Sequence, residues 1–208
     1  MYWNEFLAIA LAHLFAVASP GPDFAIVTRQ TVSFGRYAGL WTSLGVGSGI
    51  LLHVSYCLLG VALLLSQSPS LFTTVKWIAA AYLLYLGIRS VAATFKARAP
   101  APSPDPAAAA VRPARAFVMG FLTNGLNPKA TLFFLALFTV VIDVSTPVRI
   151  QVLYGIYLAV ATFVWFAMLS TVLGRDSVRG FMLRAGHWFE RAMGIVLIFL
   201  AVQIAIAS

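Results

Sequence analysis

The chain has 208 residues, of which 61% are hydrophobic and only 10% charged, and its formal net charge is +8. Soluble domains have roughly a quarter charged residues, so this composition indicates an integral membrane protein in a lipid bilayer. In a soluble chain the positive charge would favour nucleic acid, but here its placement reports on topology, and we expect no nucleic-acid partner. The single cysteine, Cys57, excludes a disulfide framework and any paired-cysteine redox or metal motif.

Six segments are apolar and long enough for the ~20 residues that a membrane-spanning helix needs. In chain order they cover residues 4–28, 40–65, 72–94, 117–142, 150–173 and 192–206. The N-terminus lacks the positive region of a signal peptide, so we expect the first segment to remain as a helix. The sequence therefore predicts an all-α integral membrane protein with six transmembrane helices.

Basic residues are distributed unevenly between the loops. The loops after the first, third and fifth segments, with their flanks, hold eleven of them: Arg29, Arg36, Arg89, Lys96, Arg98, Arg112, Arg115, Arg175, Arg179, Arg184 and Arg191. The opposite loops hold only Lys76 and Arg149. By the positive-inside rule, the basic loops lie in the cytoplasm and both termini lie outside.

Residues 99–113 are rich in proline and alanine and cannot build a core, so they predict a cytoplasmic linker. This linker separates a first three-helix repeat, residues 1–98, from a second, residues 114–208. Because three is odd, the two repeats must have opposite orientations in the membrane, which makes them an inverted repeat.

Two apolar segments contain helix breakers and charges. The first carries Ser19-Pro20-Gly21-Pro22-Asp23 and the fourth carries Asn127-Pro128-Lys129. Ser19-Pro20 and Asn127-Pro128 are both typical of an N-cap followed by the first helical residue, so we expect each broken helix to restart at that proline. Paired interruptions at matching places in two halves indicate the binding site of a transporter.

The prolines also free backbone carbonyl groups, because each removes a donor and clashes with the carbonyl four residues back. These carbonyls belong to Ala16, Ala18 and Asn124, and lipid cannot satisfy them. Together with Asp23 they suit an ammonium group. The half-helix N-termini and Lys129 suit a carboxylate, so the two breaks together suit an α-amino acid zwitterion.

Asp23 and Lys129 are ionisable residues inside predicted spans, where a charge costs several kcal/mol. They are candidates for substrate or proton binding. Alternatively they pair only to fix packing, or Asp23 is hydrated near the cytoplasm with Arg29 as a partner. Asn124 is an equally balanced candidate for substrate binding or packing, and Asn127 is at least the cap of its half-helix.

His53 lies on the second segment and is a candidate for proton coupling together with Asp23. A buried histidine is more often a hydrogen-bonded packing residue, and His13 is a weaker candidate still. The glycines of the second segment favour close helix packing. We expect no catalytic residue, no metal site and no cofactor.

The two breaks, Leu132-Phe133-Phe134 after the second of them, and the Ala-Tyr-Leu-Leu-Tyr-Leu-Gly sequence at 81–87 resemble the LysE/RhtB family of bacterial amino-acid exporters. The similarity covers essentially the whole chain. It implies an inner-membrane exporter of amino acids or close derivatives, with proton antiport as the expected coupling. The family's Pro-Gly-Pro motif falls on Pro20–Pro22 and its Asn-Pro-Lys motif on Asn127–Lys129.

The expected substrate-binding residues are Ser19, Pro20, Gly21, Pro22, Asp23, Asn124, Asn127, Pro128 and Lys129. Two alternatives stay open: an exporter of metal ions or another small cationic solute, and a non-transporting membrane assembly factor. A membrane enzyme or thiol-disulfide carrier is disfavoured, since the chain has one cysteine and no hydrolase motif. The sequence does not decide whether the protein forms a homodimer.

Overall fold

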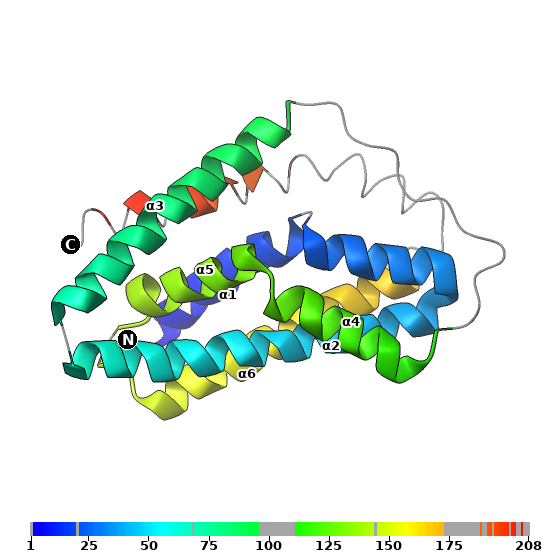
Figure 1. Cartoon of the computed structure of the whole chain (residues 1–208), viewed down its shortest axis with the longest axis horizontal. Coiled ribbons are helices and arrows are strands. Elements are labelled where there is room, and N and C mark those ends of the chain that lie inside the picture. The colour runs from blue at the N-terminus through cyan, green and yellow to red at the C-terminus, as the bar shows by residue number, and fades with distance from the viewer. Residues whose placement is uncertain are drawn as a thin grey trace.

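The computed structural model describes residues 2–19, 21–67, 69–95, 111–143 and 145–172, with residues 188, 191–192, 194–199, 201–202 and 205 near the C-terminus. Every regular element in these residues is helical (Figure 1). The elements are α1 (Tyr2–Ala18), α2 (Pro22–Gln67), α3 (Pro69–Ala93), α4 (Pro113–Gly125), α5 (Pro128–Ala136), the π-helix η1 (Leu137–Val141) and α6 (Val148–Val172).

Helix α2 is a hairpin of two arms that meet at Gly35, whose φ of 85° is outside the helical region. Glycine adopts this conformation without the steric cost that a Cβ brings. The chain turns back so sharply that a Cβ on Gly39 would lie 2.1 Å from Thr31 Oγ1. The prediction of a loop over residues 29–39 is therefore wrong. The turn is made at Gly35 alone, and both arms are helical up to it (Figure 1).

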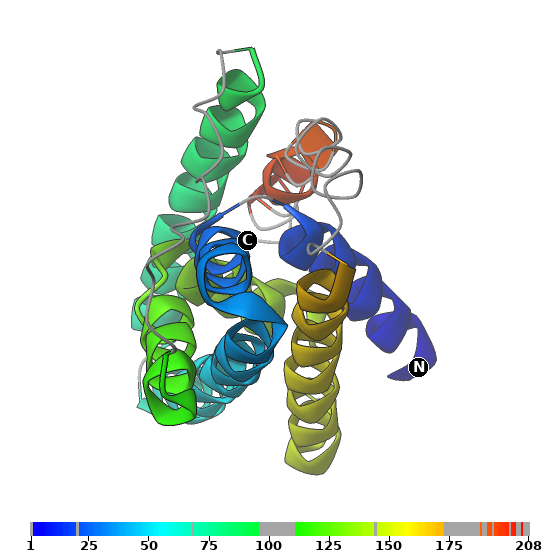
Figure 2. The same ribbon diagram turned by 90° about the vertical axis from the view of Figure 1, so that its right-hand side faces the viewer.

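Helix α2 lies between α4 and α6 (Figure 2). Glycines let its second arm approach α4 closely: a Cβ on Gly45 would lie 2.0 Å from the Phe117 carbonyl oxygen, and one on Gly120 would lie 2.1 Å from that of Thr42. No side chain fits at such distances. The packing role expected for the glycines of the second segment is confirmed at Gly45.

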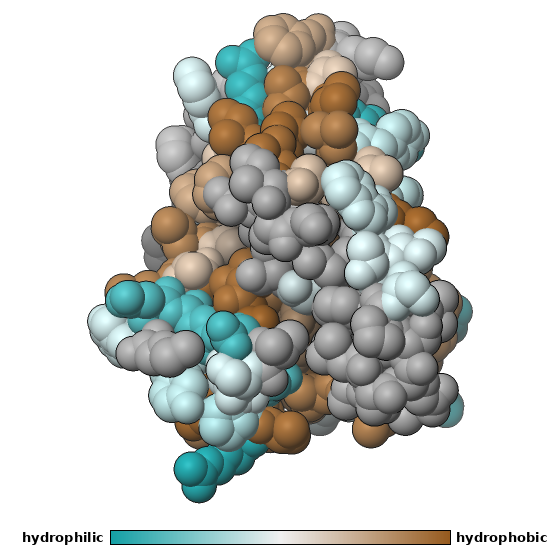
Figure 3. Space-filling view, turned by 90° about the vertical axis from the view of Figure 1, so that its left-hand side faces the viewer, coloured by the Kyte–Doolittle hydropathy of each residue, from teal (hydrophilic) through white to brown (hydrophobic). Residues whose placement is uncertain are grey.

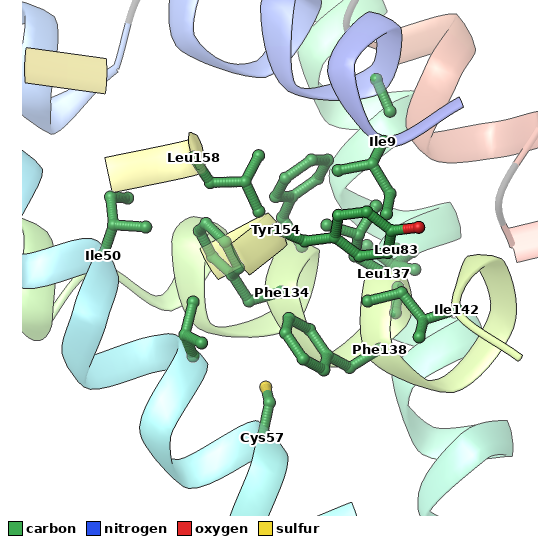
Figure 4. Packing of buried hydrophobic residues seen from close by; sticks show 14 of the residues in the cluster. Ile9, Ile50, Cys57, Leu83, Phe134, Leu137, Phe138, Ile142, Tyr154 and Leu158 are labelled. Carbon is green, nitrogen blue, oxygen red and sulfur yellow. The ribbon is translucent and has the colours of Figure 1, made fainter. Parts of the chain in front are cut away.

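The largest hydrophobic cluster joins most of the helices. Ile9 of α1, Ile50 and Cys57 of α2, Leu83 of α3, and Phe134, Tyr154 and Leu158 from the second half of the chain point toward one another (Figure 4). All are buried. Because segments from both halves supply this cluster, the halves form one packed body.

Many large apolar side chains remain on the outside of the described residues. Leu11, Leu59, Ile78, Val160 and Met168 are each more than half exposed. Hydrophobic side chains also reach the surface in the upper part of the face in Figure 3. By length and composition, Val148–Val172 and Pro22–Gly60 within α2 qualify as membrane-crossing stretches among the described residues. An apolar exterior of this extent fits a lipid environment.

The expected spans 72–94 and 150–173 correspond to α3 and α6, and the expected span 117–142 to α4, α5 and η1. Helix α4 starts earlier than expected, since Pro113 is its first residue and not the end of the linker. Residues 99–110 of the linker and residues 193, 200, 203, 204 and 206 of the sixth span lie outside the described residues. The division into two repeats thus stays a prediction.

The two ends of the bundle differ in charge. Arg29, Arg36, Arg112 and Arg115 are exposed near the Gly35 turn and the start of α4. At the opposite end Glu5 accepts hydrogen bonds from the Asp143 N–H (2.7 Å), the Thr146 hydroxyl (2.9 Å) and the Tyr154 hydroxyl (3.0 Å). The start of α1 is thereby joined to the loop before α6 at the end away from the arginines.

Candidate functional site

The two helix breaks meet in the middle of the bundle. Helix α1 ends at Ala18 and α2 begins at Pro22, while α4 ends at Gly125 and α5 begins at Pro128. A cavity of about 50 Å³ lies between them and is lined by residues of both breaks and of α6. One ordered water needs roughly 10–15 Å³, so this space holds several waters or a small solute.

The second break is capped as the sequence predicts. The Asn127 side chain accepts a hydrogen bond of 3.0 Å from the Lys129 N–H, and Pro128 is the first residue of α5. The carbonyl oxygen of Asn124 accepts from the Asn127 N–H (2.8 Å) and lies 3.0 Å from His53 Nε2. Both lone pairs of this carbonyl are thus engaged, so it is not the open ammonium ligand that the sequence led us to expect.

The first break is built differently. Helix α2 begins at Pro22, because the Gly21 carbonyl accepts the first helical hydrogen bond, 2.9 Å from the Ala25 N–H. The expected restart at Pro20 with Ser19 as its cap is therefore wrong, and Pro20 itself lies outside the described residues. The Ser19 hydroxyl instead accepts a 2.9 Å hydrogen bond from Lys129 Nζ, which links the two breaks.

The carboxylate of Asp23 is the second link. Its Oδ2 accepts from Asn124 Nδ2 at 3.0 Å and from Asn127 Nδ2 at 3.3 Å, and it interacts electrostatically with Lys129. Its Oδ1 is buried without a hydrogen-bond partner in the described part of the chain, as is Oδ1 of Asn124. A buried polar atom without a partner is costly, so these two oxygens mark a place where a donor is missing.

The structure thus brings most of the expected site residues to one cavity, namely Ser19, Gly21, Asp23, Asn124, Asn127 and Lys129. Pro22 and Pro128 are exposed helix starts and do not line it. Gly21 lies beside the lysine: a Cβ there would be in van der Waals contact with Lys129 Nζ, at 3.9 Å. A larger side chain at this position would meet the lysine.

His53 lies beside the cavity rather than in its wall. It is fully buried, its ring stacks on Phe134 with centroids 5.5 Å apart, and its Nδ1 is hydrogen-bonded to the Tyr56 hydroxyl. The Asn124 residue connects it to Asp23, through its carbonyl on one side and its amide on the other. This geometry accommodates both the packing role and the proton-coupling role that the sequence left open.

Two cavity residues carry a contact that the sequence reasoning missed. His13 Nε2 of α1 lies 2.8 Å from the Thr162 hydroxyl of α6, and both side chains line the cavity. A histidine in an apolar helix was a visible signal, but its partner lies 149 residues away and nothing in the local sequence of α6 indicates it. The aromatic lining by Phe24 and Phe166 was likewise not foreseen.

The described residues contain no group of three histidine, cysteine or acidic side chains able to hold a metal ion. In the cavity wall Asp23 is the only acidic residue among those described. The site therefore offers a divalent cation one carboxylate, whereas oxygen-ligated cations bind with several.

The chain is similar to several known proteins. A family model described as "LysE type translocator" matches residues 14–208. The threonine efflux protein of Escherichia coli strain K12 is 28% identical over 193 residues, 91% of each chain. That of Salmonella typhi is 27% identical over 191 residues, with the same coverage. The uncharacterized membrane protein YrhP of Bacillus subtilis strain 168 is 28% identical over 189 residues, 88% of this chain and 89% of that protein.

No solved structure matches the chain. The resemblance drawn from the two proline motifs is confirmed, since the family model covers both of them. The helical architecture with its apolar exterior fits the same assignment to an integral membrane transporter. The chain belongs to the LysE type translocator family.

Proposed function

We propose that this protein is a secondary transporter that exports amino acids or close derivatives from the cytoplasm. The observation that carries the proposal is the cavity between the two breaks, which holds one carboxylate and one ammonium group in a buried, mainly apolar wall. Charged residues inside a membrane bundle are costly and therefore mark substrate or ion sites. The relatives named threonine efflux proteins support the same conclusion.

A zwitterion fits the polar groups of this cavity. Its ammonium group can donate to Oδ1 of Asp23 and Oδ1 of Asn124, which have no hydrogen-bond partner among the described residues. Its carboxylate can accept from the ammonium group of Lys129, which stands at the second position of α5, where the helix dipole also favours an anion. Both charges of the substrate are then compensated away from water.

Proton antiport is the coupling that we propose for this export. Asp23 is the residue that both a proton and the substrate ammonium would use, so binding of one would displace the other. The Asn124 residue joins it to His53, which supplies a hydrogen-bonded connection toward Tyr56. We place the protein in the bacterial inner membrane with its arginine-rich end in the cytoplasm and both termini outside.

The inverted repeat is part of the same proposal. Each half begins with a helix, a break, and a second helix whose first residue is a proline and whose second is charged, Pro22-Asp23 and Pro128-Lys129. Gly87 and Gly194, which we place at matching positions of the third helix of each half, face each other, so that a Cβ on either would lie 2.8 Å from the other's carbonyl oxygen. Reciprocal contacts of this kind are expected across a two-fold axis.

The test is transport by purified protein in liposomes loaded with labelled amino acids. An outward amino-acid gradient should drive release from vesicles that contain the protein, and an opposing proton gradient should speed it. Empty vesicles and vesicles with the Lys129→Ala variant are the controls. Release at the rate of empty vesicles for every amino acid tried would refute export, and release that ignores the proton gradient would refute antiport alone.

A further inference from the structure

The cavity has two chemically different regions. The region between the breaks holds the polar residues Ser19, Asp23, Asn124, Asn127 and Lys129. The remaining wall is mainly apolar and aromatic, with Phe24, Phe133, Phe134 and Phe166 in it. The polar exception in that wall is the contact between His13 and Thr162. Because His13 precedes Ser19 by six residues, their Cα atoms are about 9 Å apart along α1, so this contact lies away from the breaks.

The hydroxyl of Thr162 is oriented differently from four buried hydroxyls of α2 and α6. Those of Thr31, Thr42, Ser43 and Ser170 donate to the carbonyl four residues back in their own helix, at 2.7–2.9 Å. Thr162 makes no such bond and is hydrogen-bonded to His13 across the cavity instead. Its side chain is 2% exposed, so its orientation is set by the interior of the protein and not by solvent or lipid.

The pair retains hydrogen-bonding capacity. Within the described residues, Nδ1 of His13 has no partner, because the ring bonds only through Nε2. The threonine hydroxyl has one donor and two acceptor positions and uses one of them. Either tautomer of the histidine therefore leaves one donor and two acceptor positions for a ligand. A ligand hydroxyl, which can both donate and accept, matches both tautomers.

We infer that the His13–Thr162 pair determines specificity by binding a hydroxyl on the side chain of a neutral amino acid. The inference rests on the proposed function, in which the breaks hold the ammonium and carboxylate groups. With Asp23 engaged by the ammonium group, the described wall offers no second carboxylate for a cationic side chain. The aromatic residues around the pair disfavour any charged side chain, since burial in an apolar wall is costly for a charge.

The test uses L-threonine and L-valine as probes, because they have nearly the same shape and differ by a hydroxyl in place of a methyl group. Both are supplied together to liposomes that contain the full-length protein, and the ratio of their transport rates is measured. A ratio taken within one vesicle preparation does not depend on how much protein is folded. We expect the wild type to prefer threonine.

Thr162→Val should reduce the threonine-to-valine ratio three- to tenfold, the range that one neutral hydrogen bond supplies. Thr162→Ser keeps the hydroxyl and should keep most of the preference. Thr42→Val is the matched control, since Thr42 is fully buried, donates to Ala38 of its own helix at 2.9 Å and does not line the cavity. Its ratio should equal that of the wild type.

A wild-type ratio near one, or an unchanged ratio in Thr162→Val, would overturn the inference and leave the proposed function standing. A Thr162→Val protein that transports threonine and valine more slowly by the same factor, and so keeps the wild-type ratio, would also overturn it. His13→Leu gives a second measurement, with the same expected loss of preference, if Thr162→Val does not insert into liposomes. Failure of the wild type to move either probe, or any other amino acid, would refute the proposed function itself.

Discussion

The two helix breaks have similar local sequences, but their polar groups make different contacts. Each places a proline at the first position of a new helix and a charged residue at the second. In the second break neighbouring residues bond to one another: the Asn127 side chain caps α5, and the Asn127 N–H donates to the Asn124 carbonyl. The polar side chains of the first break instead bind residues of the second: Ser19 accepts a hydrogen bond from Lys129, and Asp23 accepts from two asparagines.

The charges at the second positions also differ in what they cost. A carboxylate at a helix N-terminus is stabilised by the helix dipole, whereas a lysine there is destabilised, by roughly 0.3–1 kcal/mol at an exposed site. Asp23 therefore agrees with the local energetics of α2, and Lys129 opposes those of α5. A residue kept against its local preference points to a role beyond folding, which favours Lys129 as a binding residue over a packing residue.

Lys129 should show the largest effect on transport. Lys129→Ala removes the charge proposed to bind the substrate carboxylate and should lower the rate roughly 10- to 100-fold or more, as expected for a lost charged hydrogen bond. Lys129→Arg should also be folded and inactive, because a planar guanidinium does not replace a compact ammonium. The measurement is efflux of labelled amino acid from cells, normalised to the amount of protein in the membrane.

The double variant Asp23→Asn with Lys129→Ala separates binding from packing. If the two charges only compensate each other, removing both restores folding and transport, since neither is left unpaired. We expect restored folding without transport. Near-normal efflux by this variant would reduce Lys129 to a structural residue and leave the helix N-termini as the carboxylate site.

Among substitutions near the second break, Gly49→Ala should lower the stability most. A Cβ at Gly49 would lie 2.7 Å from Oδ1 and 2.9 Å from Cβ of Asn124, so Gly49→Ala must displace the asparagine that holds Asp23. Overpacking of this kind costs about 1–3 kcal/mol. Gly60→Ala is the matched control on the same helix, because among the described residues no atom outside the nearby helix backbone lies within 4 Å of its Cβ position.

Thermal unfolding in detergent checks both glycine variants. Gly49→Ala should melt at a lower temperature than the wild type, and Gly60→Ala at the same or a higher one because alanine favours helix. Equal melting temperatures for the two variants would mean that the Asn124 position is not tightly packed. The second break would then be no more rigid than the first.

Asn127 has two functions that substitution can separate. Asn127→Ala removes the cap of α5 and the hydrogen bond to Asp23. It should lower the free energy of unfolding by about 1 kcal/mol and also abolish transport. Asn127→Ser keeps a capping oxygen but has no amide to donate to Asp23. It should therefore retain near-normal stability and lose transport. Thermal unfolding and vesicle efflux measure the two effects. Loss of both stability and transport in the serine variant would contradict the separation of the capping role from the Asp23 contact.

The sequence was sufficient where the cause is local. Asn127-Pro128 predicts a capped helix start because the cap and the helix it serves are adjacent in the chain, and the structure has that cap. The first break has two prolines in three residues, and local rules do not choose between them, so the restart was expected two residues too early. The His13–Thr162 contact was missed because it depends on how α1 and α6 pack, which local sequence does not encode.

The smallest expected effects come from replacing the prolines that start α2 and α5. Pro128→Ala restores an N–H, but the Asn124 carbonyl that would accept it already has two partners, so the stability gain should be near zero. In the described residues the Ala18 carbonyl has no such partners, so Pro22→Ala, which supplies an N–H to it, can gain up to about 1 kcal/mol. This new hydrogen bond would rotate Asp23 away from the asparagines, and export should fall as stability rises. Thermal unfolding and efflux measured on both variants test this difference, and equal stability gains at the two prolines would show that the breaks are satisfied alike.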